Sequence, residues 1–425
     1  MDPRGVVIFA ITYVLISARR LGWLGFDRPA GALAGAVACV VVGVLTPRAA
    51  VDAVDTDTLL LLFGMMGLGA FLAIDGFFDH VAIVAIRVAG TPGRLLGMVV
   101  WGAGILSALI TNDAVCVLGA PLVVGIVQRH RLPALPFLLA LATGANTGSV
   151  ATLVGNPQNM LCASLGGLAY RDHLLLVGPV AVVALLINHL LVRWSFRRVL
   201  AAATFADAAP PPLPPPSPPS PQAGSAIRAR ISLVVIAGTA VAAILGAHLA
   251  WTAVTGLVVL MLVHRLDSRQ IWARIDWTVL LFFAGLFIVV EGFVDSGAPA
   301  AFFARFPLVA AGDTAVAADA GSWGSWLRLG AIFLVGANLV SNVPFILVIE
   351  QQLHSLPDPR LAWELLAVVS TFAGNLTLLG SVANLIVAEA GRDVGGMGFV
   401  DYARVGVPLA LITSAVGVGW LALLG

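Results

Sequence analysis

Long apolar runs, separated by short polar segments, extend along nearly the whole chain. Many approach the roughly 20 residues that an α-helix needs to cross a bilayer. The predicted spans lie near 5–18, 30–46, 57–75, 135–162 and 174–194, and then near 229–246, 250–264, 277–292, 361–388 and 403–424. Hydrophobic residues make up 60% of the chain and charged residues 11%, whereas soluble domains average about 25% charged residues. The pattern therefore predicts an all-α polytopic membrane protein.

Two further apolar segments each carry a short polar tip near the middle. The legs and tips are 95–110, 111–113 and 114–127 in the first half, and 327–340, 341–344 and 345–353 in the second. Each leg is shorter than the roughly 20 residues of a spanning helix. We therefore predict two re-entrant hairpins that enter and leave the membrane on one side.

Two of the predicted spans are broken by glycine, asparagine and proline. Gly155-Asn156-Pro157-Gln158-Asn159 interrupts the span 135–162, while Gly374-Asn375 and Gly380 to Asn384 interrupt the span 361–388. Unwound backbone survives at membrane depth only where it lines a protected cavity. Interrupted segments at matching positions of two halves indicate the binding site of a secondary transporter. We expect the breaks and the hairpin tips to meet near the middle of the membrane.

The chain divides into two similar halves, 1–203 and 227–425, joined by a linker at 204–226. Asp55–Gly64 resembles Asp276–Gly285, which supports duplication. Within the linker, nine of the twelve residues from Pro210 to Pro221 are proline, a composition that favours an extended spacer. Because each half has five spans, the two copies must have opposite orientations. The predicted architecture is two inverted repeats of five transmembrane helices, each with a re-entrant hairpin and a broken helix.

The distribution of arginine predicts the orientation in the membrane. One face of this arrangement carries Arg19, Arg20, Arg129, Arg131, Arg193, Arg197, Arg198, Arg228, Arg230, Arg265, Arg269 and Arg274. Positive charge marks the cytoplasmic side of a membrane protein. The linker is therefore expected in the cytoplasm and both termini outside it, in a bacterial inner membrane.

Amide, hydroxyl and glycine residues at the tips and breaks are the candidate binding groups. A helix broken within the membrane presents free N–H groups to oxygen and free C=O groups to a cation, and amides both donate and accept. The alternative is that such residues only let helices approach and bond one another. The candidate substrate-binding residues are Thr111, Asn112, Asn146, Gly155, Asn156, Asn159, Ser341, Asn342, Gly374, Asn375, Gly380, Ser381 and Asn384.

Asp113 is the only carboxylate at either hairpin tip. An acid within the membrane is costly, which makes it a functional hypothesis by default. Apolar surroundings favour its neutral form, so Asp113 is the candidate site for a coupling proton or sodium ion. The alternative is that Asp113 caps the second leg of the hairpin. Asp75 and Glu291, which each precede a glycine near the end of a span, are expected to be solvated acids at the membrane interface.

Several classes of function are excluded or disfavoured by composition. Cys39, Cys116 and Cys162 lie in apolar segments without the spacing of metal ligands. A net charge of +1 without a basic run gives no support for nucleic-acid binding. The chain has no lysine and therefore no P-loop. We expect neither an enzyme nor a bound cofactor, and any uphill transport must draw on an ion gradient or a separate cytoplasmic ATPase subunit.

At these residues the chain resembles the ion transporter superfamily, which includes arsenical pump membrane proteins, sodium/proton antiporters and divalent anion:sodium symporters. The likeness is closest to the arsenical-pump and silicon-efflux branch, and it covers both halves. The motifs that carry it are Thr111 to Cys116, Gly148 to Asn159, Ser341 to Pro344 and Gly374 to Leu385. The resemblance implies a mobile domain of hairpins and broken helices, and a scaffold that often forms a homodimer. Tip one departs from the dicarboxylate symporters, which have Ser-Asn-Thr there.

The leading hypothesis is a secondary active transporter in the lipid bilayer. It would move a small inorganic anion or neutral metalloid hydroxide, such as arsenite or silicic acid, outward in exchange for protons. A sodium-coupled dicarboxylate or sulfate symporter and a sodium/proton antiporter remain open as alternatives.

Overall fold

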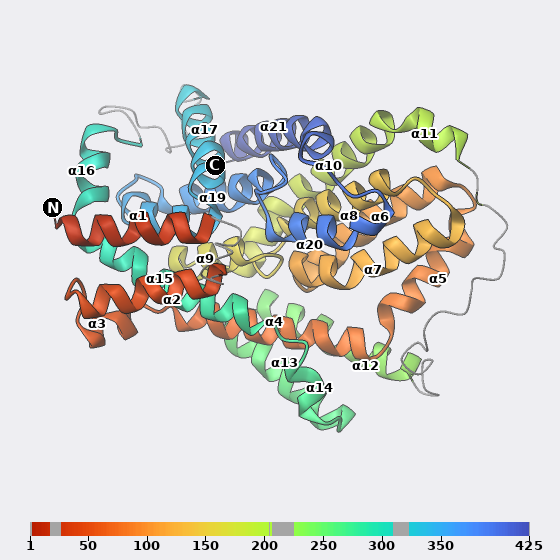
Figure 1. Cartoon of the computed structure of the whole chain (residues 1–425), viewed down its shortest axis with the longest axis horizontal. Helices are drawn as coiled ribbons and strands as arrows, with labels where there is room; N and C mark the ends of the chain where they lie inside the picture. The colour runs from red at the N-terminus through yellow and green to blue at the C-terminus, as the bar shows by residue number, and fades with distance from the viewer. Residues whose placement is uncertain (1, 18–26, 204, 206–224, 309–322, 425) are drawn as a thin grey trace.

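The computed structural model describes residues 2–17, 27–203, 205, 225–308 and 323–424, and all regular structure within these ranges is helical (Figure 1). The first half contains α1 (Pro3–Ser17), α2 (Arg28–Val41), α3 (Pro47–Asp52), α4 (Thr56–Ile74), α5 (Phe77–Ala89), α6 (Pro92–Leu109), α7 (Asn112–His130), α8 (Ala134–Ser149), α9 (Pro157–Gly166), α10 (Tyr170–Ser195) and α11 (Arg197–Ala202). The second half contains α12 (Ser225–Ile244), α13 (Leu249–His264), α14 (Ser268–Trp272), α15 (Trp277–Asp295), α16 (Ala298–Arg305), α17 (Trp323–Leu339), α18 (Asn342–His354), α19 (Pro359–Ala373), α20 (Val382–Ala390), the short 3-10 helix η1 (Arg392–Val394) and α21 (Phe399–Leu424). Most of the predicted linker, residues 206–224, lies outside the described ranges.

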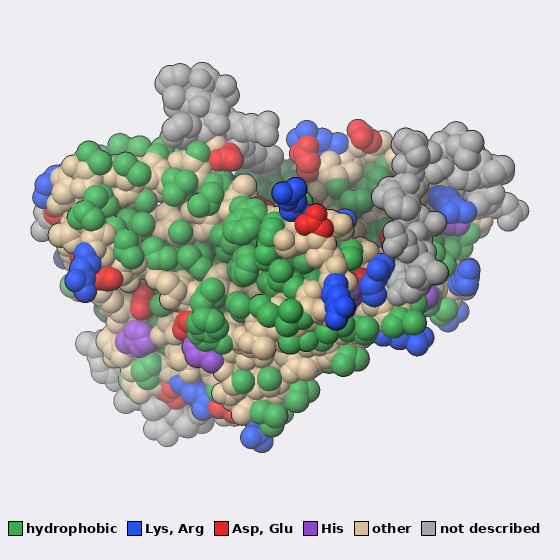
Figure 2. Space-filling view, turned by 90° about the horizontal axis from the view of Figure 1, so that it is seen from below, with side chains coloured by type: hydrophobic (Ala, Val, Ile, Leu, Met, Phe, Trp, Pro, Cys, Tyr) green, Lys and Arg blue, Asp and Glu red, His purple; other side chains and the backbone are tan. Residues whose placement is uncertain are grey.

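The prediction of an all-α polytopic membrane protein is confirmed. Among the described residues, seven helices are long and apolar enough to cross a membrane: α4, α6, α7, α10, α12, α15 and α21. Large apolar side chains cover much of the surface (Figure 2). Val41, Leu245 and Leu262, for example, are 78%, 81% and 69% exposed. Exposed apolar area on this scale marks a surface that contacts something other than water, and lipid tails satisfy it.

The order of helices in the first half is repeated in the second. From α12 to α21 the chain repeats the sequence of lengths from α1 to α10, including the six-residue α3 and five-residue α14, and the 26-residue α10 and α21. The sequence predicted the long helices but missed several short ones: α3, α11 and α14, which have five or six residues, and the counterparts α5 and α16. Both are short, with 13 and 8 residues, and therefore lack the length that marks a spanning helix.

The relative directions of α4 in the first half and α13 in the second half follow from two ion pairs between them. Asp57 at the start of α4 lies 3.3 Å from His248 at the start of α13. Asp75 at the end of α4 lies 3.2 Å from His264 at the end of α13. The two helices therefore run in the same direction. Figure 1 shows the chain turning back at α3, so that α2 and α4 run in opposite directions. Since α13 is the counterpart of α2, this is the arrangement expected of two halves with opposite orientations.

The legs of the first hairpin are longer than predicted. α6 and α7 have 18 and 19 residues, so length alone does not distinguish them from spanning helices. The sequence underestimated them because polar groups at both outer ends belong to the helices: Thr91 caps α6, and Arg129 and His130 close α7. The second hairpin has shorter legs, with 17 residues in α17 and 13 in α18.

Each broken helix stops and restarts within the packed interior, as predicted. α8 ends at Ser149 and α9 begins at Pro157, while α19 ends at Ala373 and α20 begins at Val382. A Cβ atom at Gly155 would lie 2.1 Å from the Ser149 carbonyl oxygen. The first break therefore folds back on the end of its own helix, in a way that only glycine permits.

Glycines also bring α6 and α8 into contact. A Cβ atom at Gly148 would lie 2.2 Å from the Cα atom of Gly104, and one at Gly144 would lie 2.8 Å from the Val100 carbonyl oxygen. Small residues at such crossings let backbones approach closely, which is a main source of helix association in membranes. This contact fixes the first hairpin against the first broken helix.

We expect Gly148→Ala to lower the thermal stability of the purified protein in detergent. The new methyl group would force α6 and α8 apart, and overpacking of this kind costs about 1–3 kcal/mol. Gly102→Ala, also on α6, is the control, because its Cβ atom would meet nothing within 4 Å. Equal melting temperatures for the two variants in a fluorescence-monitored scan would contradict this account of the packing.

Candidate functional site

Asn146, near the end of α8, is the centre of a buried cluster of amides. Its Oδ1 accepts hydrogen bonds from Asn112 Nδ2 at 3.0 Å and from Ser381 Oγ at 3.1 Å. Its Nδ2 donates to Asn375 Oδ1 at 3.2 Å and to Asn384 Oδ1 at 2.8 Å. These four bonds use the full capacity of one amide. A single side chain of the first half thereby holds the first hairpin tip and the break of the second half.

The second half makes the corresponding contact with Thr371 on α19. Thr371 Oγ1 donates to Asn159 Oδ1 at 2.9 Å and accepts from Asn156 Nδ2 at 3.0 Å. The two contacts repeat at a constant interval of 225 residues, since 371 − 146, 384 − 159 and 381 − 156 all equal 225. Each half therefore supplies a polar side chain to the break of the other.

Each break is also closed by its own asparagine. Asn159 Nδ2 donates to the Thr152 carbonyl at 3.0 Å, and Asn384 Nδ2 donates to the Thr377 carbonyl at 3.2 Å. Asn384 Nδ2 also donates to the Gly374 carbonyl at 2.8 Å. These bonds satisfy carbonyl groups that unwinding of the helix leaves free.

The hairpin tips lie against the breaks of their own halves. The backbone N–H of Asn112 donates to the Gly155 carbonyl at 2.9 Å, and Asn342 Nδ2 lies 3.5 Å from the Gly380 carbonyl. Ser341 has a φ of 73°, a conformation that costs a non-glycine residue about 1–3 kcal/mol and is found mainly at functional sites. Contacts with the rest of the protein must therefore offset the cost of this strained turn at tip two.

Both tips line one cavity of about 510 Å³. The amide oxygens Asn112 Oδ1 and Asn342 Oδ1 are buried and have no hydrogen-bond partner among the described residues. An unpaired buried acceptor costs about 1–3 kcal/mol. Two such oxygens on opposite tips of one cavity indicate a place where a ligand supplies the missing donors or positive charge.

Asp113 also lines this cavity. It does not cap α7, because Thr111 Oγ1 accepts the bond from the Ala114 N–H at 3.2 Å. That alternative was wrong. The Asp113 carboxylate instead interacts with the backbone of Ala383 in the first turn of α20. A carboxylate is favourable at a helix N-terminus, so Asp113 connects the first hairpin with the second broken helix.

The predicted binding residues fall into two groups. Those that line the cavity are Asn112, Asp113, Ser341, Asn342, Gly380 and Ser381. Those that lie in the network behind it are Thr111, Asn146, Gly155, Asn156, Asn159, Gly374, Asn375 and Asn384. The structure thus brings all of them into one region but gives only the first group access to the cavity.

The prediction that Asp75 is a solvated interfacial acid was wrong. Asp75 is 2% exposed, because α12 and α13 of the other half pack over the end of α4. Ser232 Oγ donates to its Oδ2 at 2.7 Å, and His264 Nε2 and Arg228 Nε lie 3.2 and 3.7 Å from its oxygens. This group ties the two halves together away from the amide cluster. Glu291, by contrast, is partly exposed and lines a separate cavity.

Polar groups of the interior that the sequence analysis missed include, besides Thr371, Asn188 and Glu364. Asn188 on α10 extends the amide network, accepting from Thr143 Oγ1 at 3.0 Å and donating to Thr147 Oγ1 at 3.3 Å. Glu364 on α19 pairs with His173 on α10 at 2.6 Å. A polar residue inside an otherwise apolar run was the signal in both cases, since such residues are retained in membranes for a reason.

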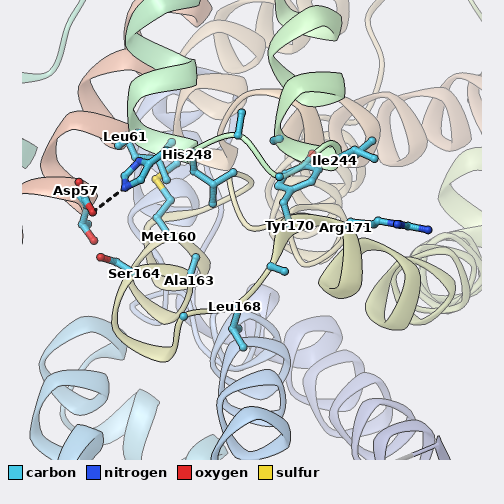
Figure 3. A pocket seen from close by; sticks show the side chains of 18 residues that line it. Asp57, Leu61, Met160, Ala163, Ser164, Leu168, Tyr170, Arg171, Ile244 and His248 are labelled. Carbon is cyan, nitrogen blue, oxygen red and sulfur yellow. Dashed lines mark ion pairs between the residues drawn. The ribbon is translucent and has the colours of Figure 1, made fainter.

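A second cavity, of about 330 Å³, lies between α4, α9, α10 and the α12–α13 turn (Figure 3). The ion pair between Asp57 and His248 lies at one side of it, and Tyr170 and Met160 line it. None of the predicted binding residues contributes to its lining. The amide cluster and its cavity are therefore the better candidate site.

The known proteins to which this chain is similar are named as transporters. Residues 13–373 match the family model described as citrate transporter (CitMHS). The silicon efflux transporter LSI3 of Oryza sativa subsp. japonica is 32% identical, covering 97% of this chain and 96% of that protein. The putative transporter arsB of Dictyostelium discoideum is 25% identical, covering 99% and 92%. The crystal structure of the Alcanivorax borkumensis YdaH transporter has a TM-score of 0.51 at 17% identity, covering 98% and 96%, which is a likeness of fold.

We expect Asn146→Asp to destabilise the protein strongly. The change removes both donors and leaves Asn375 Oδ1 and Asn384 Oδ1 facing an acceptor, at a cost of about 2–4 kcal/mol. Gln351→Glu makes the same change of amide to acid at an exposed position and should have little effect. Matching denaturation midpoints for the two variants would show that the Asn146 network does not hold the halves together.

Proposed function

Since the chain belongs to the citrate transporter family, we propose that this secondary transporter moves a small, weakly charged inorganic solute out of the cell in exchange for protons. Arsenite and silicic acid are the best candidates. Two relatives, a silicon efflux transporter and the putative transporter arsB, support this class of solute. The membrane would be the bacterial inner membrane, with the linker on the cytoplasmic side.

The pair of unpaired amide oxygens at the two tips carries the proposal. Arsenous and silicic acids are uncharged at neutral pH and present several O–H groups. Such hydroxyls can donate to Asn112 Oδ1 and Asn342 Oδ1, which lack donors among the described residues. Their oxygens can accept from the side-chain amide of Gln158, which lines the same cavity. A solute bound there would be held by both halves at once.

The charge of the cavity favours a neutral solute over a polyanion. Among its described lining residues, the charged ones are Asp113 and Arg28. A tricarboxylate would leave most of its charge unpaired in this site, and burial of an unpaired charge is very costly. Neutral hydroxides meet no such penalty.

Asp113 is the proposed site of the coupling proton. It is the one acid among the described residues that line the cavity, and its carboxylate meets the N-terminus of α20. Protonation removes the charge that this N-terminus attracts. Proton binding would therefore loosen the first hairpin from the second half, which links the coupling ion to opening of the site.

The opposite directions of corresponding helices support alternating access. In transporters of inverted repeats, one part rocks or slides against the other around a fixed site. Here the hairpins and broken helices would move together, because the amide cluster joins them. The remaining helices would form the scaffold, through which a homodimer would assemble, and a cytoplasmic ATPase would be an optional partner.

A sodium-coupled carboxylate symporter is the second candidate. The family description names citrate, and uncharged carbonyl oxygens such as Asn112 Oδ1 and Asn342 Oδ1 are suitable ligands for a hard cation. Sodium-stimulated uptake of citrate or succinate into intact cells, without transport of arsenite or silicic acid, would favour it over the leading proposal.

We expect Asp113→Asn to abolish coupling while leaving the solute site intact. In everted vesicles, accumulation of arsenite or silicic acid driven by a pH gradient should fall by about tenfold or more, the equivalent of at least ~1.4 kcal/mol. Exchange of labelled for unlabelled solute should persist, because exchange needs no net proton movement. Asp79→Asn, a change at an exposed acid, is the control. Undiminished pH-driven accumulation in Asp113→Asn would remove this residue from the coupling step.

We expect Asn342→Ala to weaken solute binding without unfolding the protein. Its amide makes one long bond of 3.5 Å, so little stability is lost, whereas a bound hydroxyl would lose an acceptor worth about 1 kcal/mol or more. The KM for arsenite or silicic acid should rise about fivefold or more. Asn338→Ala, at another amide that lines the cavity, is the comparison: its Nδ2 is paired with the Ala373 carbonyl at 2.7 Å, so its loss should lower stability. An unchanged KM in Asn342→Ala would argue against a solute at this tip.

A further inference from the structure

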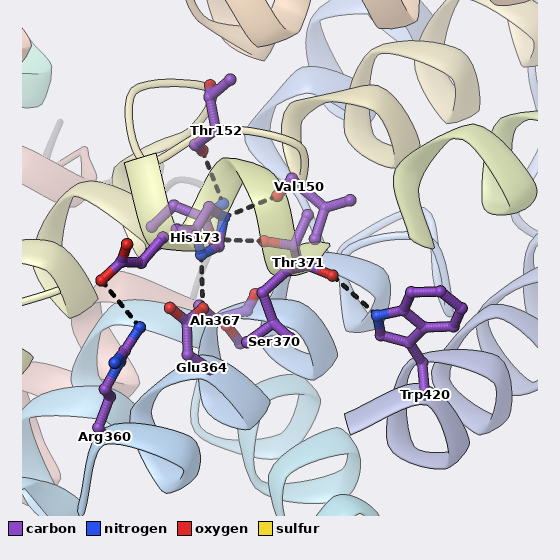
Figure 4. Close-up of polar contacts among 12 residues, drawn as sticks. Val150, Thr152, His173, Arg360, Glu364, Ala367, Ser370, Thr371 and Trp420 are labelled. Atoms are coloured by element: carbon purple, nitrogen blue, oxygen red, sulfur yellow. Dashed lines mark hydrogen bonds and ion pairs between the residues drawn. The ribbon is translucent and has the colours of Figure 1, made fainter. Parts of the chain in front are cut away.

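A buried acid–base pair joins the two halves behind the first broken helix (Figure 4). His173 lies in the first turn of α10 and Glu364 in the second turn of α19. His173 Nδ1 and Glu364 Oε2 are 2.6 Å apart, and the two side chains are 0% and 1% exposed. His173 Nε2 lies 3.0 Å from the carbonyl oxygen of Val150, the residue that directly follows α8.

These contacts fix how many protons the pair holds. The Val150 carbonyl can only accept, so His173 Nε2 must carry a proton. The short contact between Nδ1 and Oε2 then needs a second proton, because a ring lone pair and a carboxylate would repel each other at 2.6 Å. The pair is either imidazolium with carboxylate or neutral imidazole with carboxylic acid. In both forms it holds one shared proton and has no net charge.

Among the residues that the structure describes, no group near the pair compensates the negative charge that loss of this proton would leave. Cys162 on α9 faces Glu364 and is uncharged as a thiol. Arg360, one turn before Glu364, is exposed and bonded to Asp172 at 3.0 Å. His354 on α18 lies against the ring of Trp363. A single negative charge left in these surroundings would be costly, so the shared proton stays while the site is closed.

The pair acts on the break through two short routes. Val150 follows Ser149, whose Oγ accepts from Asn156 Nδ2 at 2.9 Å. On the other side, Thr371 lies two turns after Glu364 on α19, about 10 Å along the helix, and bonds Asn156 and Asn159. Movement of the break would therefore displace the Val150 carbonyl and Thr371, separate His173 from Glu364 and let water reach the pair.

We propose that His173 and Glu364 form a proton-binding site distinct from Asp113, which holds one proton in the conformation described here and releases it when the α8–α9 break moves. The inference rests on the proposed function. On release, the proton shared by Nδ1 and Oε2 passes to water, and the charge of the pair changes from zero to minus one without oxidation or reduction. Glu364 Oε1, which is buried without a hydrogen-bond partner among the described residues, is where water would enter.

Two substitutions of Glu364 separate proton binding from simple bracing. In Glu364→Gln the side-chain amide donates to His173 Nδ1, so the hydrogen bond between α10 and α19 remains but no proton can leave. Glu364→Leu removes both the hydrogen bond and the proton. If the pair only stabilises the break, the Glu364→Gln variant should match the wild type in stability and in proton release, and the Glu364→Leu variant should be unstable. If the pair carries a proton, Gln should keep the stability of the wild type and lose proton release. Asp172→Asn, the adjacent exposed acid, is the control.

The decisive measurement is proton release from purified protein on addition of arsenite in weakly buffered solution. The wild type and Asp172→Asn should release about one proton more per protein than Glu364→Gln, while Glu364→Gln still exchanges labelled arsenite at a rate within about twofold of the wild type. Measurable proton release that is equal in the wild type and in Glu364→Gln would overturn the inference.

If the wild type releases no proton with arsenite or silicic acid, that result counts against the proposed function but does not test the pair. An infrared titration without solute then tests the pair directly. A carboxylic acid or imidazolium band that disappears at high pH in the wild type, and is absent from Glu364→Gln, supports the pair. The absence of any such difference between the two proteins overturns it.

Discussion

Backbone that leaves a helix inside a membrane has no water to bond, and this constraint shapes the centre of the protein. The segments 150–156 and 374–381 are unwound, and each frees N–H and C=O groups that must find partners. Side-chain amides supply them. Asn159 and Asn384 close their own breaks, and Asn146 and Thr371 secure the break of the opposite half. Each broken helix is therefore stabilised by hydrogen bonds from both halves.

The cavity lies where this pairing ends. Asn146 uses all four of its hydrogen-bonding positions, whereas Asn112 and Asn342, which line the cavity, each keep one buried amide oxygen without a donor among the described residues. Amides of the same kind thus stabilise the fold where their partners are internal, and they are the proposed solute ligands where a partner is missing. Asp113 adds the one acidic group of the lining and reaches the second half through the start of α20. In the proposed function, proton binding and solute binding therefore act on the same two elements, the first hairpin and the second broken helix.

The sequence predicted the elements well and the roles of single residues less well. Glycine, asparagine and proline mark the tips and breaks because each has a local effect on the backbone, so these features could be located without a structure. Asp75 could not be placed, because its partners Ser232 and His264 are more than 150 residues away and only packing brings them together. Asn146 and Asn112 look alike in sequence, yet one is enclosed and the other faces the cavity. The distinction depends on which neighbours complete each amide.

The constant interval of 225 residues between corresponding groups has an evolutionary consequence. Two copies of an ancestral unit can retain one interval from Asn146 to Asn159 and from Thr371 to Asn384 only if neither has gained or lost a residue there since they diverged. Insertions and deletions are then free to accumulate in connecting segments but are excluded from this stretch. The number of residues between these polar groups would then stay the same in both halves even after most side chains around them had changed.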